Sequence, residues 1–183
     1  MPDQLTTRLI TAFGKESVWM GEDLAGRAAG YLKNEPLQAK ALLRPGSTQE
    51  VSEMLKLCWA AGQAVVPHGG LTNLVNSTHT TKDDIAISLE RMCSVEEIDP
   101  VGGTMTVQCG AVLQDVQQAA EEAGLFFAVD LPARESAVIG GLIGTNAGGL
   151  RVVRYGMMRD AVLGLEAVLA DGTILNMMNK MLK

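Results

Sequence analysis

The apolar positions of the chain follow a strand, helix, strand order from residue 41 onward. Ala41–Leu43 is a short apolar run that is typical of a strand. Ser47, with Glu50 three residues later, is typical of a helix start, and apolar residues then recur every three or four positions up to Gly62. A second apolar run, Ala64–Pro67, follows the glycine. The pattern therefore predicts a parallel strand–helix–strand unit.

Further along the chain, the pattern predicts more strands and a second long helix. Alternation over 85–89 indicates a strand, and apolar stretches at the two ends of 95–107 flank a turn-like centre, which indicates a hairpin. Residues 112–124 carry apolar residues at helical spacing and end in a glycine. An Asp-Gly pair in the middle of 161–175 predicts a second hairpin. Residues 6–13 favour a short helix near the N-terminus.

Composition places the chain among globular proteins. Of its 183 residues, 47% are hydrophobic and 20% are charged, which fits neither disorder nor a collagen-like repeat. The formal net charge is -6 and no run of basic residues occurs, so we expect no nucleic-acid partner. The first ten residues lack the features of a secretion signal, and no apolar stretch reaches the roughly 18 residues of a membrane span. We therefore expect a cytoplasmic location.

Three parts are expected along the chain. Residues 1–40 form a helical and irregular segment, because they are polar and show little periodicity beyond the first helix. Residues 41–175 form the main domain, with two subdomains whose boundary lies near 90–100. Residues 176–183 form a half-apolar tail without a helix stop signal, so we interpret the chain as a truncated part of a longer protein.

The cysteines and histidines indicate neither disulfides nor a metal site. Cys58, Cys93 and Cys109 are odd in number and widely spaced, so we expect reduced thiols. His68 and His79 have no acidic or cysteine partner at the spacing that metal ligands show. We interpret both histidines as surface or loop residues and predict no metal.

Two glycine-rich stretches carry the strongest chemical signal, and the first is Pro67–Leu74. Glycines allow several main-chain N–H groups to approach one anionic group, because they lack a Cβ atom. Thr72 adds a hydroxyl donor, and Asn73 is the non-glycine residue best able to adopt a positive φ. A plain turn is the alternative interpretation of a Gly-Gly pair alone.

The second stretch, residues 140–149, has glycine at half of its positions. Such a density indicates a backbone pressed against something flat or charged, with Ser136, Thr145 and Asn146 as side-chain hydrogen-bonding groups. About 70 residues separate the two stretches, so a ligand that touched both would be extended, as a dinucleotide is. Neither stretch matches the compact GxGxxG fingerprint or a Gly-Lys-Ser/Thr phosphate loop.

Several ordered motifs together resemble the N-terminal FAD-binding region of the vanillyl-alcohol oxidase superfamily of FAD-linked oxidases. The matching motifs are Arg44-Pro45, Pro67–Leu74, Asp130-Leu131, Ser136, Gly140-Gly141, Thr145–Gly149, Arg154–Gly156, Met158–Asp160, Val162–Glu166 and Ala170–Thr173. The nearest branch resembles the glycolate oxidase flavoprotein subunit, D-lactate dehydrogenase and D-2-hydroxyglutarate dehydrogenase. The resemblance implies an α+β fold of the PCMH type, in which a small parallel βαβ subdomain packs with a larger, mainly antiparallel sheet flanked by helices.

The resemblance also implies which residues hold FAD. They are Pro67, His68, Gly69, Gly70, Leu71, Thr72, Asn73, Leu74, Asp130, Leu131, Ser136, Gly140, Gly141, Thr145, Asn146, Gly148 and Gly149. The first loop would wrap the pyrophosphate, and the residues from Ser136 onward would line the flavin side. Relatives that attach flavin covalently often have histidine where this chain has Leu71, so noncovalent FAD is implied. Asn73, Pro132 and Glu135 depart from the glycines that are usual in the family.

The function implied by the resemblance is oxidation of a small 2-hydroxy acid by hydride transfer to flavin N5. The substrate would bind through a C-terminal cap that this chain lacks, so we assign no catalytic residue. The alternative is a noncatalytic or flavin-reductase-type domain with a degenerate FAD pocket. A membrane or an electron-transfer partner subunit, and a homo-oligomer, are the macromolecular partners that we consider.

Overall fold

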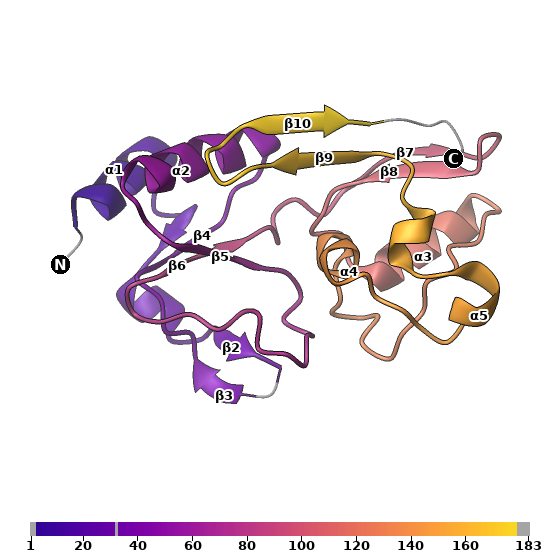
Figure 1. Cartoon of the computed structure of the whole chain (residues 1–183), viewed down its shortest axis with the longest axis horizontal. Coiled ribbons are helices and arrows are strands. Elements are labelled where there is room, and N and C mark those ends of the chain that lie inside the picture. Colours follow the sequence, from indigo (N-terminus) through magenta and orange to yellow (C-terminus); the bar gives the residue numbers. More distant parts are fainter. Residues whose placement is uncertain (1–2, 32, 179–183) are drawn as a thin grey trace. The chain divides into compact units, whose positions relative to one another are not determined.

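The computed structural model describes residues 3–31 and 33–178. These residues fall into two compact units, one within 1–91 and 167–175 and the other within 92–166 and 176–183 (Figure 1). Of the tail expected over 176–183, residues 179–183 lie outside the described part of the chain. Among the described residues, no helix is both long and apolar enough to cross a membrane.

The first unit is built on a four-stranded sheet with the strand order β1-β4-β6-β5. β4 (Ala41–Leu43) and β5 (Val65–His68) both run parallel to β6 (Ile85–Ser88), which lies between them, and β1 (Val18–Trp19) pairs antiparallel with β4. Helix α2 (Thr48–Ala60) connects β4 to β5. The predicted strand–helix–strand crossover is therefore confirmed, with β6 inserted between its two strands.

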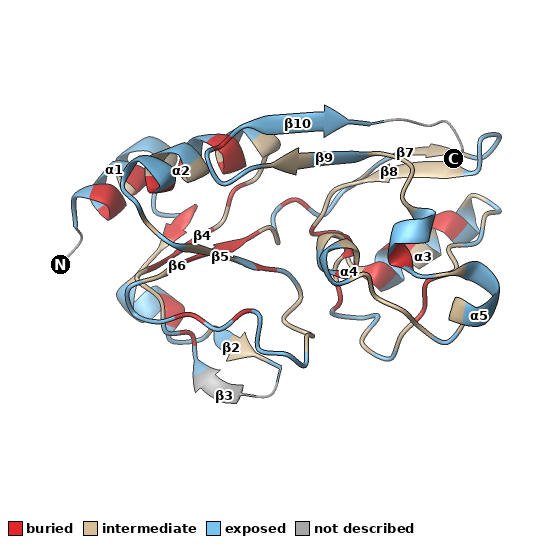
Figure 2. Ribbon diagram, viewed as in Figure 1, coloured by how far each residue is buried: buried red, intermediate tan, exposed pale blue. Residues whose placement is uncertain are grey.

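β4 and β6 form the buried centre of this sheet (Figure 2). All four residues of Ile85–Ser88 are buried, and so are all three of Ala41–Leu43. The alternation expected for residues 85–89 is thus replaced by continuous burial, because parallel strands in the middle of a sheet are covered on both faces. Val51, Met54 and Cys58 are the apolar residues of α2 that are buried.

Helix α2 begins where the sequence predicts it. Ser47 Oγ accepts a hydrogen bond from Glu50 N at 3.1 Å, which satisfies one free N–H group of the first turn. The Glu50 carboxylate accepts from Gly46 N at 2.8 Å, one residue earlier than the reciprocal bond of a standard capping box. Gly62 follows the helix with a φ of 62°, as expected for a glycine after a helix C-terminus.

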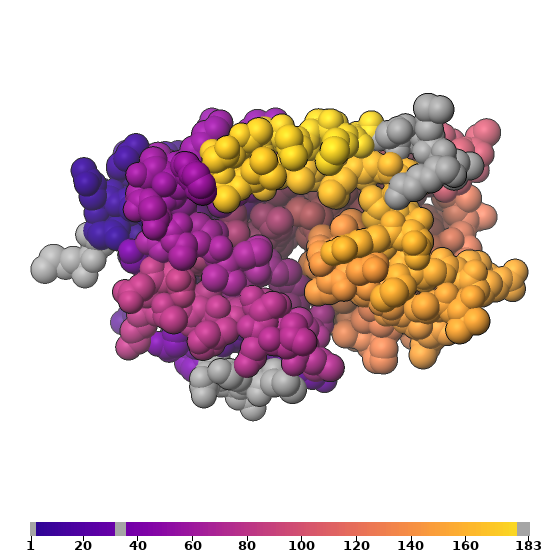
Figure 3. Space-filling view, in the orientation of Figure 1, coloured from indigo at the N-terminus to yellow at the C-terminus, as the bar shows by residue number. Residues whose placement is uncertain are grey.

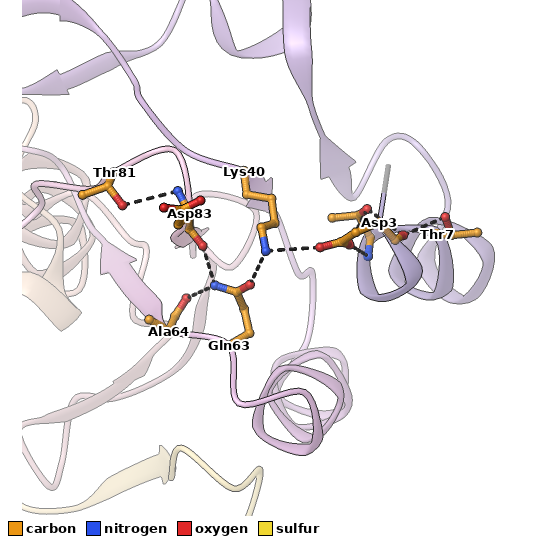
Figure 4. A network of polar contacts seen from close by, with 8 residues as sticks. Asp3, Thr7, Lys40, Gln63, Ala64, Thr81 and Asp83 are labelled. Atoms are coloured by element: carbon orange, nitrogen blue, oxygen red, sulfur yellow. Dashed lines mark hydrogen bonds and ion pairs between the residues drawn. The ribbon is translucent and has the colours of Figure 1, made fainter. Parts of the chain in front are cut away.

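Helix α1 (Gln4–Phe13) is joined to the sheet by a polar network (Figure 4). Asp3 caps the helix and forms an ion pair with Lys40 Nζ at 3.1 Å. Lys40 also donates to Gln63 Oε1 at 2.7 Å, and the Gln63 amide donates to Asp83 O at 2.8 Å. The network connects four segments that are distant in sequence, so the N-terminal residues are an integral part of the first unit.

The segment expected to be irregular, residues 14–40, contains short regular elements. They are β1, the 3₁₀ helix η1 (Gly21–Leu24), β2 (Ala28–Gly30) and β3 (Lys33–Pro36), the last two paired antiparallel. Elements of two to four residues are too short to show a repeating hydrophobic pattern, which is why periodicity misses them.

The second unit contains an antiparallel hairpin and several helices. β7 (Val95–Asp99) and β8 (Thr104–Val107) form the predicted hairpin, and α3 (Leu113–Glu122) is the predicted helix. Three short helices follow, α4 (Ile139–Thr145), α5 (Val152–Tyr155) and η2 (Met158–Ala161). The buried core of this unit comprises Ala111, Leu113, Val116, Val129, Ala137, Ile139, Leu142 and Met158.

The last hairpin, β9 (Leu165–Val168) and β10 (Ile174–Met177), is confirmed, and its turn packs on helix α2 (Figure 3). Gly172 has a φ of 85°, and a Cβ atom there would lie 2.6 Å from Ser52 O. Ser52 Oγ donates to Gly172 O at 2.5 Å. A turn that needs both a left-handed backbone and this close approach requires glycine.

The α+β class is confirmed. In the described residues, however, the antiparallel strands form separate two-stranded ribbons rather than one larger sheet, apart from β1 at the edge of the four-stranded sheet. β7 and β8 form one of these ribbons and β9 and β10 another, and neither ribbon pairs with a further described strand.

Candidate cofactor-binding loops

The first glycine-rich stretch begins at the carboxyl end of β5. Pro67 and His68 are the last two residues of that strand, and Gly69 opens the connection to β6. Connections at the carboxyl ends of parallel strands are the usual place for ligands in sheets of this kind. The order of elements therefore puts the glycine pair where a ligand would be bound.

Main-chain N–H groups in this loop are free. Within the part of the chain that the structure describes, the N–H groups of residues 69–74 donate no hydrogen bond to another protein group. Val75 N and Ser77 N, just beyond them, are both bound to Asn73 Oδ1. Gly69 and Leu74 are exposed and the residues between them half-buried, so water or a ligand can reach the free donors. Successive free N–H groups in a turn are donors that can converge on anionic oxygens.

Within residues 67–74, Leu71 has a positive φ, at 56°, and Asn76 just beyond them has the same value. The sequence favoured Asn73 for that conformation, and this expectation is wrong. Asn73 instead uses its side chain, whose Oδ1 accepts from Val75 N at 3.2 Å and from Ser77 N at 3.0 Å. The propensity of asparagine for local hydrogen bonding is thus satisfied without a left-handed backbone.

His68 is buried, with 3% of its surface exposed, so its interpretation as a surface or loop residue is wrong. Its Nε2 lies 2.9 Å from Thr78 O, and because a carbonyl can only accept, Nε2 carries the hydrogen. Burial lowers the pKa of His68, which outweighs the hydrogen bond to Thr78, and the charge on Arg27 lowers it further. His79 is exposed, as expected.

In the second unit, the segment around Asp130 is held by main-chain contacts. Asp130 is buried, and its carbonyl oxygen accepts a hydrogen bond from Leu150 N at 2.9 Å. Its carboxylate is flanked by Arg134 Nη1 at 3.3 Å and Arg151 Nη2 at 3.4 Å, which compensate its charge. Although Asp130 Oδ1 forms an ion pair, it accepts no hydrogen bond from the described residues. Asp130 therefore fixes the course of its own segment, with both arginines as partners.

Two glycines of the second stretch are required by contacts within the protein. A Cβ atom at Gly140 would lie 2.9 Å from Cys109 Cβ, and one at Gly149 would lie 2.8 Å from Asp130 C and closer still to Asp130 O. At these two positions the Cβ side of the backbone is therefore packed against the protein itself, so glycine is required there whether or not a ligand is bound. Gly144 has no neighbour within 4 Å, and Gly141 has ordinary contact with Val138.

The polar residues of the second stretch form hydrogen bonds around helix α4. Thr145 Oγ1 donates to Gly141 O at 2.9 Å. Asn146 ends the helix with a φ of 50°, and its Oδ1 accepts from Arg159 N at 3.0 Å. The Arg159 side chain donates to the carbonyls of Ile143 and Gly144, at 2.9 and 2.8 Å. Arg159 thereby binds the carbonyl end of α4, a role that its place in a family motif did not reveal.

The remaining predicted site residues lie at the surface of the second unit. Ser136 is exposed, and its N–H donates to Ala133 O at 3.0 Å, while Leu131 is half-buried. Gly148 and Gly149 are half-buried, and their N–H groups donate to no other protein group in the described residues. The structure thus groups residues 67–74 in the first unit and those from 130 to 149 in the second.

No set of three or more His, Cys, Asp or Glu side chains is placed to hold a metal ion, as judged on residues 3–31 and 33–178. Cys58 is buried, Cys109 half-buried and Cys93 exposed, and all three are free thiols. Burial raises the pKa of Cys58 to about 11 and also raises that of Cys109, so neither is poised as a thiolate nucleophile.

Comparison with known proteins gives the family. Residues 39–178 match the model of the FAD binding domain family. This chain is a member of that family. The matched segment includes both glycine-rich stretches and leaves out residues 1–38 and 179–183, and FAD is accordingly its cofactor.

Relatives of this FAD-binding domain include proteins named as dehydrogenases and one named as a transhydrogenase. The chain is 43% identical over 162 residues to a mitochondrial D-2-hydroxyglutarate dehydrogenase of Bos taurus. The aligned segment covers 88% of this chain and 30% of that protein. It is 40% identical to a D-2-hydroxyglutarate–pyruvate transhydrogenase of Saccharomyces cerevisiae, and covers 33% of it. The chain therefore spans about a third of the length of these relatives.

Solved structures share the fold of this FAD-binding domain. Alkyldihydroxyacetonephosphate synthase superposes with a TM-score of 0.82 at 18% identity, over 97% of this chain and 34% of that one. The 6-hydroxy-D-nicotine oxidase of Arthrobacter nicotinovorans gives 0.74 at 21% identity, over 86% and 34%. These neighbours confirm the fold expected from the resemblance.

The expected cytoplasmic location is wrong. It is contradicted by relatives from Bos taurus, Rattus norvegicus and Danio rerio, which are named as mitochondrial D-2-hydroxyglutarate dehydrogenases. The expectation rested on the absence of a secretion signal in the first ten residues, and that absence does not distinguish the cytoplasm from an organelle.

Proposed function

We propose that this chain is the FAD-binding portion of a flavin-dependent oxidoreductase that oxidises a small 2-hydroxy acid. The run of free N–H groups over residues 69–74 carries the proposal, because a diphosphate is the ligand class that such a run suits best. The names of the dehydrogenase relatives support the substrate class. When bound, FAD supplies a flavin that accepts the hydride of the substrate.

The residues of the loop would act by binding and orientation. The N–H groups from Gly69 to Asn73 would hold the diphosphate, and the Thr72 hydroxyl would add a donor. Pro67 and His68, as strand residues, fix the start of the loop. The exposed carboxylate of Glu135 is free to face water rather than an anionic ligand.

Noncovalent binding is part of the proposal. Leu71 supplies no nucleophile at the position where some family members attach flavin. His68, the nearest histidine in sequence, is buried, and its Nε2 donates to Thr78 O. Neither residue is suited to form a bond to the flavin ring.

Titration of the purified chain with FAD tests the proposal. We expect saturable binding with quenching of flavin fluorescence, competed by inorganic pyrophosphate. The double variant Gly69→Val, Gly70→Val should weaken FAD binding at least 100-fold, because branched side chains block the approach of phosphate oxygens to the N–H groups. Gly26→Ala, which adds a methyl group in open space in the same unit and outside both glycine-rich stretches, is the control and should leave the affinity unchanged.

A second measurement tests the substrate class separately from the cofactor. The flavin absorbance of the FAD-loaded, complete protein should bleach on addition of D-2-hydroxyglutarate or D-lactate under anaerobic conditions, and denaturation should release all of the FAD. FAD that binds but is bleached by no 2-hydroxy acid would contradict the substrate class. A parent chain without affinity for FAD would favour a noncatalytic domain with a degenerate pocket.

A further inference from the structure

The loop over residues 69–77 is closed at its base by a side chain. His68 is the last residue of β5, and its Nε2 donates to the carbonyl of Thr78, ten residues further on, at 2.9 Å. Both residues are buried, at 3% and 6% exposed. A buried hydrogen bond of this kind is costly to break, because the donor and acceptor would be left without water. It joins the two ends of the loop that carries the free N–H groups.

A second set of bonds crosses the interior of the loop. Asn73 Oδ1 accepts from Val75 N and Ser77 N, and Asn73 Nδ2 lies 3.4 Å from Thr78 Oγ1. Thr78 Oγ1 in turn donates to Ala29 O at 3.2 Å, in strand β2. Thr78 therefore connects the base of the loop, its interior and a neighbouring strand.

The backbone at Leu71 needs such support. Its φ of 56° is unfavourable for a residue with a side chain. A residue in this region persists where the surrounding structure holds it there, and such residues often occur at ligand sites. The free N–H groups flank Leu71 on both sides, so their directions depend on this conformation.

We propose that His68, Asn73 and Thr78 form a loop clamp that holds the free N–H groups of residues 69–74 in the geometry that binds a diphosphate. His68 is a positioning residue, since it acts through Thr78. The clamp assigns a role to Asn73, which departs from the glycine usual in the family. The inference rests on the proposed function only for the identity of the ligand.

Substitutions at His68 test the clamp in the complete chain. His68→Leu removes the donor at similar volume, whereas His68→Gln keeps an amide N–H that can reach Thr78 O. Two quantities are measured for each variant: the exchange rates of the Val75 and Ser77 amide hydrogens, and the dissociation constant for FAD. We expect His68→Leu to raise both at least tenfold, and His68→Gln to stay within threefold of the parent.

Met54→Ala separates positioning from general loss of stability. Met54 is fully buried in α2, and its truncation destabilises the same unit without removing a hydrogen bond of the clamp. We expect this variant to keep its FAD affinity and the two amide exchange rates within threefold of the parent at a temperature where it is folded. Equal effects of His68→Leu and Met54→Ala, or of His68→Leu and His68→Gln, would overturn the clamp. A parent that binds no FAD would refute the proposed function, and the amide exchange rates would still decide the clamp.

Discussion

Gly149→Ala is expected to destabilise the protein strongly, although it adds one methyl group. The new Cβ atom would lie 2.8 Å from Asp130 C and 3.2 Å from Asp130 N, and nearer still to Asp130 O. These are main-chain atoms, which cannot rotate away as a side chain can. The segments around Gly149 and Asp130 must therefore move apart.

The size of the effect follows from two contributions. Overpacking of a close contact costs about 1–3 kcal/mol. Separation of the segments also breaks the hydrogen bond from Leu150 N to Asp130 O, which is worth about 1 kcal/mol net. A loss of about 3 kcal/mol in the free energy of unfolding is expected, which corresponds to a fall of roughly 6–12 °C in Tm for a chain of this length.

Gly144→Ala is the matched control. Gly144 lies within α4, has nothing within 4 Å of its Cβ position and is exposed. Because alanine favours helix over glycine, this variant should be as stable as the parent or about 0.5–1 kcal/mol more stable. Urea unfolding followed by circular dichroism measures both variants. A Gly149→Ala variant within 0.5 kcal/mol of the parent would refute the argued contact.

Two further substitutions test local features. Ser47→Ala should lower the free energy of unfolding by about 1 kcal/mol, because it removes the N-cap hydrogen bond of α2. Ser47→Asp should retain most of that stability, because aspartate can also accept the bond. Equal losses of the two variants in urea unfolding would refute the cap. Burial lowers the pKa of His68 from its usual 6.5, so the unfolded chain binds this proton at a higher pH than the folded one does. The stability that neutral His68 contributes is therefore complete above pH 6.5. It is lost as the pH falls below 6.5 toward the lowered pKa, by up to about 1.4 kcal/mol per pH unit. Stability measured between pH 7 and 5 should therefore fall more steeply in the parent than in His68→Gln, and parallel slopes would contradict this account.

Local features of the fold could be predicted from the sequence. The N-cap at Ser47, the end of α2 at Gly62 and the turn at Gly172 depend on residues within a few positions of each other, so their chemistry is visible in one short stretch. The insertion of β6 between β4 and β5 depends on long-range strand pairing, which no local sequence pattern predicts.

The place of the first glycine-rich loop after a strand could be predicted from the sequence, but its internal contacts could not. The Gly69-Gly70 pair after a strand indicated an anion-binding loop from local sequence. The buried bond between His68 and Thr78 depends on the path of the loop between them, so the histidine was misinterpreted as exposed. The contact of Gly149 with Asp130 could not be predicted, because the two residues are nineteen positions apart in the sequence.

The bond between Ser52 and the turn at Gly172 has a consequence for how the protein is made. The first unit is discontinuous, because residues 167–175 complete it after the whole of 92–166 has been synthesised. During synthesis, the surface of α2 around Ser52 therefore stays uncovered until the β9–β10 hairpin has emerged from the exit tunnel. Domains that are contiguous in sequence can finish folding in order of synthesis, whereas this unit is completed only after residues 92–166 have emerged from the exit tunnel.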